Sequence, residues 1–250
     1  MDLFASVRGF FAPEIETFSE TKDGIRYSIS EKGDMRYFKF NGIVYSQLSK
    51  SSVLVYSYHD KFLLLPALYE KPRILLIGLG AGTIPYQLSK LYPGMFSLDV
   101  VDTNPESINH TKKFLQTNEL PFNVIIESGE KYVEKCTNQY DIIIQDAFVN
   151  DRIPAQFTDD KFIASAKKAL SPDGILAINY APEVVYLPFY KYKLRKQFQH
   201  VYHISHISMG NYILLSSKQF DKKEMLDKIE ARTWSESNAK ILLKSYKSMK

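Results

Sequence analysis

Residues 74–83, with the sequence ILLIGLGAGT, decide the fold class of this chain. The apolar residues 74–77 form a run of the length expected for a central parallel strand. Gly78, Gly80 and Gly82 follow and let the backbone turn tightly beside a ligand. A helix that starts there directs its free N–H groups and positive dipole end at that ligand. The stretch therefore predicts a strand–turn–helix unit that binds a nucleotide-type ligand.

An acid after the next apolar run supports this prediction. Asp102 ends the run Val100-Val101-Asp102, near the spacing at which an acid accepts hydrogen bonds from ribose hydroxyls. The glycine spacing is G-x-G-x-G, and Thr83 occupies the position of the third glycine of a dinucleotide fingerprint. This departure disfavours an NAD-binding module. A tight strand–helix turn that binds no ligand remains the structural alternative.

The composition is that of an ordinary globular protein. The chain has 250 residues, of which 45% are hydrophobic and 24% charged. Its single cysteine, Cys136, excludes an intrachain disulfide and a cysteine metal cluster, so we expect a reducing, cytoplasmic location. No run reaches the roughly 18 apolar residues of a membrane span. The net charge of +4 is spread along the chain, which favours a solvated surface over a nucleic-acid interface.

Three regions follow one another along the sequence. We expect residues 1–68 to form a small β region with strands at 24–30, 35–40 and 43–46, joined by a helix at 53–68 to the next region. The pair Asn41-Gly42 is the clearest hairpin signal. Residues 69–217 form a nucleoside-binding α/β domain, and residues 218–250 a charged helical tail with Met225, Ile229, Ile241 and Leu242 able to pack.

The central region alternates strand and helix. Strands are predicted at 74–77, 96–101, 124–127, 142–144 and 175–178, the last after a turn at 171–174, with an antiparallel final pair at 201–207 and 212–216. This alternation indicates a doubly wound, mostly parallel sheet. Ligands of such sheets lie beyond the carboxyl ends of the strands. Those ends hold Gly78, Asp102, Ser128 and Asp146.

Three histidines suggest a metal site at first sight. His200, His203 and His206 are three residues apart, a spacing that brings ligands together on a helix. The segment is rich in Val, Tyr and Ile and therefore predicts a strand, in which residues three apart point to opposite faces. We expect no bound metal.

Several motifs together resemble the spermidine synthase family, the polyamine aminopropyltransferases, over about residues 33–218. Phe40-Asn41-Gly42 stands where the family has a Leu-Asp-Gly turn, and Tyr58-His59-Asp60 is similar to its Tyr-His-Glu helix start. Residues 140–146, YDIIIQD, resemble the family's Tyr-Asp-x-Ile-x-x-Asp stretch. Residues 169–176, ALSPDGIL, resemble its turn into the fifth strand.

The resemblance implies a Rossmann-like class I methyltransferase fold and an S-adenosylmethionine (AdoMet) or decarboxylated AdoMet cofactor. It implies that Asp146 is catalytic, because an amine that attacks a carbon beside a sulfonium needs a carboxylate to orient it and take its proton. The cofactor residues it implies are Gly78, Gly80, Gly82, Asp102, Ser128 and Asp146. The candidate substrate-pocket residues are Tyr45, Tyr58, Asp151 and Tyr180, the last either lining the pocket or capping the core.

The departures from the family pattern concern charge. Two family acids that meet ammonium groups are replaced by Ala81 and Val149, and a third, which contacts adenine, by Ser128. A substrate-site glutamine is replaced by Tyr45 and a tyrosine by Lys32. Burying an ammonium without a carboxylate costs several kcal/mol. The loss of these acids therefore indicates that the part of the site that binds the polyamine differs from that of the family.

Three functions are therefore open at this point. The first is aminopropyl transfer from decarboxylated AdoMet to a polyamine or other small-molecule amine. The second is methyl transfer from intact AdoMet, and the third is a catalytically inactive partner subunit of the same fold. The N-terminal strands are too few to be stable alone, so we expect a homodimer or higher homo-oligomer.

Overall fold

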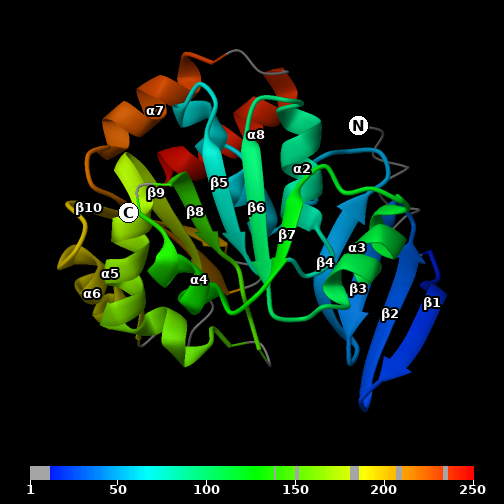
Figure 1. The fold of residues 1–250 in the computed structure, drawn as a ribbon. Coiled ribbons are helices and arrows are strands. Elements are labelled where there is room, and N and C mark those ends of the chain that lie inside the picture. Colours follow the sequence, from blue (N-terminus) through cyan, green and yellow to red (C-terminus); the bar gives the residue numbers. More distant parts are fainter. Residues whose placement is uncertain (1–11, 138, 150–151, 181–185, 207–209, 233–235) are drawn as a thin grey trace.

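Two β-sheets lie side by side in the computed structural model, which describes residues 12–137, 139–149, 152–180, 186–206, 210–232 and 236–250 (Figure 1). A four-stranded sheet has the order β1-β2-β3-β4, and a seven-stranded sheet the order β10-β11-β9-β8-β5-β6-β7. The small sheet holds β1 (Ile15–Lys22), β2 (Ile25–Lys32), β3 (Met35–Phe40) and β4 (Ile43–Ser49).

Tight turns shape the N-terminal sheet, whose neighbouring strands are all antiparallel. Asp23 and Gly24 have φ of 52° and 77°, and Asn41 and Gly42 have φ of 47° and 82°. Two consecutive positive φ values are the signature of the hairpin turns that match strand twist. The three expected strands are confirmed. The strand β1 was not expected, because it is a largely exposed edge strand without a clear apolar alternation.

The predicted helix at 53–68 is wrong. The chain forms two short 3-10 helices there, η1 (Tyr58–Phe62) and η2 (Leu65–Leu68). The Asp60 carboxylate accepts the backbone N–H groups of Val55 at 3.1 Å and Tyr56 at 2.7 Å. A short acidic side chain that bonds nearby backbone in this way stabilises a tight loop in competition with an α-helix.

The large sheet carries the site. Its strands are β5 (Arg73–Ile77), β6 (Ser97–Asp102), β7 (Asn123–Ile126), β8 (Tyr140–Gln145), β9 (Leu170–Tyr180), β10 (His200–His206) and β11 (Asn211–Ser217). The strands from β9 to β7 are parallel, and β11 pairs antiparallel with both β9 and β10. The predicted mostly parallel sheet with an antiparallel last pair is confirmed.

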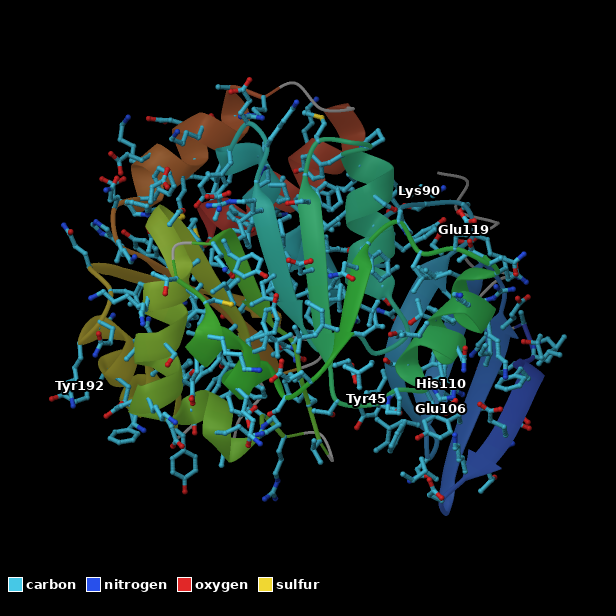
Figure 2. The ribbon with its side chains drawn as sticks, in the orientation of Figure 1. Tyr45, Lys90, Glu106, His110, Glu119 and Tyr192 are labelled. Atoms are coloured by element: carbon cyan, nitrogen blue, oxygen red, sulfur yellow. The ribbon has the colours of Figure 1, made fainter. Side chains whose placement is uncertain are left out.

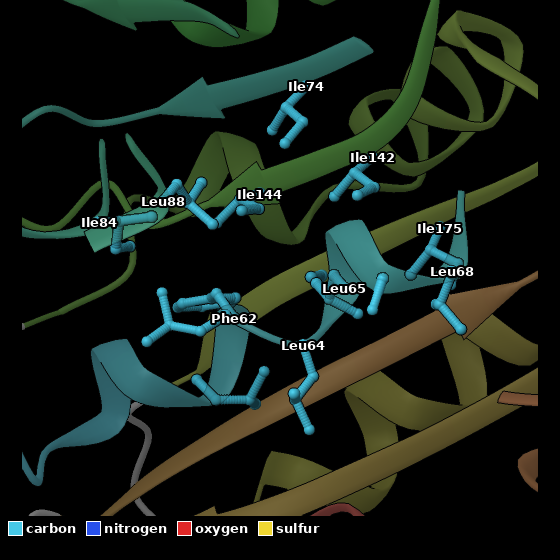
Figure 3. Close-up of a cluster of buried hydrophobic side chains, with 14 of the residues drawn as sticks. Phe62, Leu64, Leu65, Leu68, Ile74, Ile84, Leu88, Ile142, Ile144 and Ile175 are labelled. Carbon is cyan, nitrogen blue, oxygen red and sulfur yellow. The ribbon is translucent and has the colours of Figure 1, made fainter. Parts of the chain in front are cut away.

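Helices cover both faces of this sheet (Figure 1). They are α2 (Thr83–Leu91), α4 (Gly129–Lys135), η3 (Ala155–Thr158), α5 (Asp160–Ala169), α6 (Leu187–Arg195), α7 (Lys222–Glu230) and α8 (Glu236–Lys247). The helix α3 (Ser107–Leu115) packs instead against the N-terminal sheet, where Phe114 contacts its buried side chains. Alternate residues of β5 enter different cores. Ile74 joins the core formed with η1, η2, α2, α7 and α8 (Figure 3), whereas Leu75 joins the core formed with α4, α5 and α6. Burial on both faces explains why the strands are continuous apolar runs.

Two local predictions need correction. The segment 171–174 is a bulge within β9, since Leu170 faces Tyr140 and Ile175 already faces Ile142. In the tail, Met225, Ile229 and Leu242 are buried, but Ile241 is 45% exposed.

Among the helices that the described residues form, none has both the length and the apolar character needed to cross a membrane.

The N-terminal sheet is fixed against the glycine turn. The Ser46 hydroxyl of β4 accepts the backbone N–H of Ala81 at 2.9 Å. The Thr83 hydroxyl, at the start of α2, donates to the Gln47 carbonyl and accepts the Gln47 N–H, both at 3.0 Å. Ala81 and Phe114 also pack among buried side chains of this sheet. These contacts set the N-terminal sheet at the edge where the strands of the large sheet end.

Candidate functional site

A cavity of about 970 Å³ lies where the carboxyl ends of β5, β6 and β8 meet the N-terminal sheet. Figure 2 shows Tyr45 between the two sheets and His110 on α3, and both line this cavity. The structure brings together most of the residues expected from the sequence. Those that line the cavity are Gly78, Gly80, Asp102, Asp146, Tyr45 and Tyr58.

The glycine turn requires its glycines. Gly78 has φ of 96°, and a Cβ added there would lie 2.8 Å from the backbone of Ala147. Gly82 has φ of 90° but is not among the described lining residues, and a Cβ on it would lie 2.8 Å from Thr111 of α3. Gly78 thus allows two strand ends to approach closely, whereas Gly82 allows close packing of α2 on α3.

Backbone N–H groups hold the Asp102 carboxylate at the end of β6. It accepts the N–H groups of Leu79 and Asn104, both at 2.8 Å, and that of Gly80. Partial burial raises the pKa of Asp102, and these hydrogen bonds oppose the rise by favouring the charged form. All three donors lie in the two turns that follow β5 and β6. The carboxylate therefore ties these turns together at the position expected for a ribose.

Side chains from distant segments hold the Asp146 carboxylate after β8. It accepts the Asn179 amide at 2.7 Å and the Tyr58 hydroxyl. The side-chain oxygen of Asn179, Oδ1, in turn accepts a hydrogen bond from the side-chain amide of Asn211 at 2.8 Å. Burial raises the pKa of Asp146 to about 7, and the hydrogen bonds from Asn179 and Tyr58 oppose this rise. Such a carboxyl takes up or releases a proton near neutral pH, as a general base does.

Asn179 and Asn211 were not expected at the site from the sequence. Both line the cavity, from the end of β9 and the start of β11, and both are at most 7% exposed. The sequence pattern that could have indicated them is a polar residue at the end of an otherwise apolar strand. This pattern alone does not show which group the side chain would bind.

The Tyr58-His59-Asp60 motif divides between two environments. Tyr58 and His59 line the cavity with their rings stacked at 4.0 Å between centroids. Burial and the Asp146 charge raise the pKa of Tyr58 well above its usual value, so Tyr58 stays protonated and donates to Asp146. Asp60 is buried, and it accepts the Gln87 amide at 2.7 Å in addition to its backbone contacts. Asp60 is thus a structural residue.

Besides Gly82, two of the expected residues do not line the cavity, and a third cannot be placed. Tyr180 is 4% exposed and stacks on Tyr190 of α6 with 5.0 Å between ring centroids, so its ring belongs to the core and not to the cavity wall. Ser128 is the N-cap residue of α4, and its neighbours Glu127 and Gly129 line the cavity while Ser128 does not. Asp151 lies outside the described residues.

The positions that depart from the family pattern lie in different parts of the structure, and not all of them line the cavity. The Ala81 side chain is fully buried against the N-terminal sheet and does not line the cavity. Val149 lines the cavity and is 59% exposed. Lys32 is not among the described lining residues, so its positive charge does not form part of the described cavity wall.

The cavity is acidic. Its described lining includes no lysine or arginine but has the carboxylates of Asp23, Asp102, Glu127, Glu130 and Asp146. The buried Ser107 hydroxyl, at the start of α3, also lines it and has no hydrogen-bond partner among the residues that the structure describes. An acidic lining and an unused buried hydroxyl suit a cationic ligand that carries hydroxyl groups, and a nucleoside sulfonium is such a ligand.

Comparison with known proteins identifies the family. Residues 56–205 match the family model described as the spermine/spermidine synthase domain. The chain belongs to the spermine/spermidine synthase family. A polyamine aminopropyltransferase of Neisseria meningitidis is 27% identical over 222 residues, covering 84% of this chain and 83% of that protein. The chain spans less than half the length of three other relatives, from Vibrio vulnificus, Bifidobacterium longum and Prochlorococcus marinus (37%, 30% and 46%).

Solved structures support the fold. A probable spermidine synthase of Corynebacterium glutamicum superposes with a TM-score of 0.73 at 19% identity, over 84% of this chain and 86% of that one. A spermidine synthase in complex with the transition-state analogue AdoDATO gives 0.68 at 20% identity, over 92% and 84%. Human methyltransferase-like protein 13 in complex with SAH gives 0.59 at 20% identity, over 72% and 96%. The spermidine synthase-like class I fold expected from the sequence is confirmed.

Proposed function

We propose that this protein transfers an aminopropyl group from decarboxylated AdoMet to an amine. The observation that carries the proposal is the position of Asp146 in an acidic cavity at the strand ends. The curated relatives named polyamine aminopropyltransferase support the reaction type. Decarboxylated AdoMet, when bound, supplies a sulfonium-activated CH₂ group for attack by the amine.

The charge of the cavity favours the decarboxylated nucleoside over intact AdoMet. Intact AdoMet carries a carboxylate on its tail, and the described lining offers it carboxylates but no lysine or arginine. Like charges at close range destabilise binding, more strongly where water is excluded. Decarboxylated AdoMet carries an ammonium and a sulfonium, both attracted by the lining. Methyl transfer is therefore the less favoured reaction.

Each residue has a role in this proposal. Asp102 accepts hydrogen bonds from the ribose hydroxyls, and the turn at Gly78 and Gly80 lets the nucleoside approach the backbone. Asp146 accepts an N–H of the amine and takes its proton as the nitrogen bonds to the CH₂ group. The C–S bond breaks with its electron pair left on sulfur, which becomes a neutral thioether. Tyr58 and Asn179 hold the Asp146 carboxylate in place.

Paired titrations with AdoMet and decarboxylated AdoMet test the proposal. Calorimetry is expected to give at least about tenfold tighter binding of the decarboxylated nucleoside, equal to about 1.4 kcal/mol. Mass spectrometry of a reaction with amines is expected to find the amine heavier by one aminopropyl group, together with 5′-methylthioadenosine. Tighter binding of intact AdoMet, with methylated products, would refute aminopropyl transfer. Failure to bind either nucleoside would favour an inactive partner subunit.

We also propose a homodimer. Among the described residues β1 pairs with β2 alone and is largely exposed, and sheets with unpaired edges commonly pair or are covered. Sedimentation velocity at micromolar concentration is expected to give twice the mass of 28.8 kDa. A single species at the monomer mass would contradict this.

A further inference from the structure

One edge of the large sheet is formed by a stretch of sequence that contains no acids. Residues 184–220 include no aspartate or glutamate, but five lysine or arginine residues. The described part of this stretch forms α6, β10 and β11. The strand β10 is the outermost strand of the sheet on this side, and α6 contacts it (Figure 1). Charges of a single sign over such a length produce a positive local potential at this edge.

The cations of this edge lack acidic partners. In the part of the chain that the structure describes, Lys191, Arg195 and Lys196 form no ion pair, whereas Lys193 lies 3.9 Å from Asp160. The Lys191 ammonium instead lies 3.1 Å from Nδ1 of a β10 histidine. Burial and the charge of Arg195 lower the pKa of Lys191, so these two cations repel each other. An anionic partner would relieve this repulsion.

Exposed aromatic side chains lie on the same helix. Tyr186, Phe189 and Tyr192 are 57%, 59% and 57% exposed. Their spacing of three residues places them along one side of α6, and Figure 2 shows Tyr192 at the outer edge of the molecule. The other side of the helix is buried in the core and holds Leu187, Tyr190 and Leu194. A group of exposed aromatic rings beside unpaired cations marks an interaction surface.

We propose that α6 binds the surface of an anionic lipid membrane, with its three exposed rings among the headgroups and with Arg195 and Lys196 at the lipid phosphates. Aromatic rings favour the headgroup level of a bilayer, because they combine a large apolar area with a polar or polarised edge. Lysine and arginine next to an anionic leaflet add attraction that salt screens. The inference is independent of the proposed reaction.

Two other partners fit this surface less well. A symmetric contact with a second copy of the chain would place the cations of α6 against the same cations. A single-stranded nucleic acid stacks its bases on free ring faces. Here the ammonium groups of Lys193 and Lys196 lie over the rings of Phe189 and Tyr192, at 5.4 Å and 4.8 Å from the centroids. Insertion among headgroups leaves these pairs in place, since the lysines reach the interface.

Co-sedimentation of the whole protein with lipid vesicles tests the proposal. One set of vesicles is pure phosphatidylcholine, and the other contains about 30% phosphatidylglycerol. Partitioning is expected to be at least about tenfold stronger with the anionic lipid. In about 0.5 M salt this preference is expected to disappear. Equal partitioning to the two sets at low salt, or no binding to either, would overturn the proposal.

A charge variant tests whether α6 is the surface that binds. Lys196→Gln is expected to weaken partitioning to the anionic vesicles about fivefold. Lys228→Gln is the matched control, because Lys228 also lies over an aromatic ring, that of Phe220 at 5.2 Å, but belongs to α7. It removes the same charge and is expected to change partitioning by less than about twofold. An equal loss in the two variants would show that net charge alone causes the binding.

An aromatic variant tests the insertion of the rings. Tyr192→Ser is expected to weaken partitioning at least about threefold, because less apolar area enters the interface. Tyr56→Ser is the control, since Tyr56 is 53% exposed and lies outside α6. It is expected to leave partitioning unchanged. If Tyr192→Ser has no effect, the rings do not insert and the proposal is wrong.

The same variants distinguish the other partners. If the protein binds a single-stranded oligouridylate more tightly than vesicles at the same salt, and Lys196→Gln weakens that binding, the partner is a nucleic acid and the proposal is wrong. If Tyr192→Ser reduces the mass in sedimentation velocity while vesicle binding is unchanged, a second copy covers α6 and the proposal is again wrong. Loss of vesicle binding with an unchanged mass supports the membrane surface.

Discussion

The ends of β6 and β8 hold two carboxylates of one cavity in different ways. Asp102, at the end of β6, accepts backbone N–H groups of Leu79, Gly80 and Asn104, which the adjacent turns fix. Asp146, after β8, accepts side-chain groups of Tyr58 and Asn179, which come from segments far away in the sequence. The first carboxylate is set by local backbone geometry. The second depends on the packing of the whole α/β unit.

This difference matches the two tasks proposed for the carboxylates. A binding carboxylate benefits from rigid donors that keep it charged. A proton acceptor benefits from a pKa near the working pH, and burial gives Asp146 a pKa of about 7. Side-chain donors can be changed one at a time by mutation, whereas backbone donors cannot. The two sites therefore predict different responses to substitution.

The largest effect is expected from Asp146→Asn. The amide cannot take a proton from the amine, so kcat for aminopropyl transfer is expected to fall by about 10²- to 10⁴-fold. Binding of 5′-methylthioadenosine, which carries no sulfonium charge, is expected to stay within about threefold by calorimetry. Asp227→Asn on α7 is the control, since Asp227 is 59% exposed and pairs only with Lys223 among the ion pairs of the described residues. Retention of kcat by Asp146→Asn would contradict the assignment.

Asp102→Ala is expected to produce the opposite pattern. Loss of a charged hydrogen-bond acceptor, worth about 1.5–3 kcal/mol, is expected to weaken binding of 5′-methylthioadenosine by about 10- to 150-fold. The N–H groups of Leu79, Gly80 and Asn104 lose their acceptor, so stability in urea is expected to fall by about 1–3 kcal/mol. A variant that keeps its nucleoside affinity would show that the ribose lies elsewhere.

A smaller effect concerns the pH profile. Asp146 must be ionised to accept a proton, so kcat/KM for the amine is expected to rise with pH through about 7. The Asn179 amide donates to the ionised carboxylate and lowers its pKa, so Asn179→Leu is expected to shift the rise to higher pH. The variant is expected to lose roughly threefold more activity at pH 6 than at pH 9. An equal loss at both pH values would indicate a merely structural role.

A further effect concerns the pH dependence of stability. The pKa of Asp146 is about 7 in the folded protein and 3.8 as its ordinary value, so between these values the folded state binds more protons than the unfolded state. The contribution of Asp146 to stability therefore falls as pH rises through this window. Asp146→Asn removes this dependence. Two pH units below the folded pKa correspond to about 2.7 kcal/mol, so the Tm of the variant relative to the unchanged protein is expected to increase by about 5–10 °C between pH 5 and pH 8. A constant difference in Tm would contradict the raised pKa.

The sequence alone determined the features that depend on neighbouring residues. The apolar run, the glycines at 78 and 80 and the acid at 102 predicted a strand, a turn and a ligand-facing carboxylate, and the Asn41-Gly42 pair predicted a hairpin that the structure contains. Strand periodicity and turn chemistry act over a few residues. They can therefore be recognised without knowledge of the tertiary contacts.

Only the tertiary structure decided which distant side chains meet. Tyr58, Asn179 and Asn211 join Asp146 across separations set by the order of the strands in the sheet. The same packing turns Ala81 toward the N-terminal sheet and Tyr180 into the core. The physical reason is that a polar residue at a strand end has the same local signal whether it faces a ligand, a partner side chain or the core. Its environment is fixed only when the layers pack together.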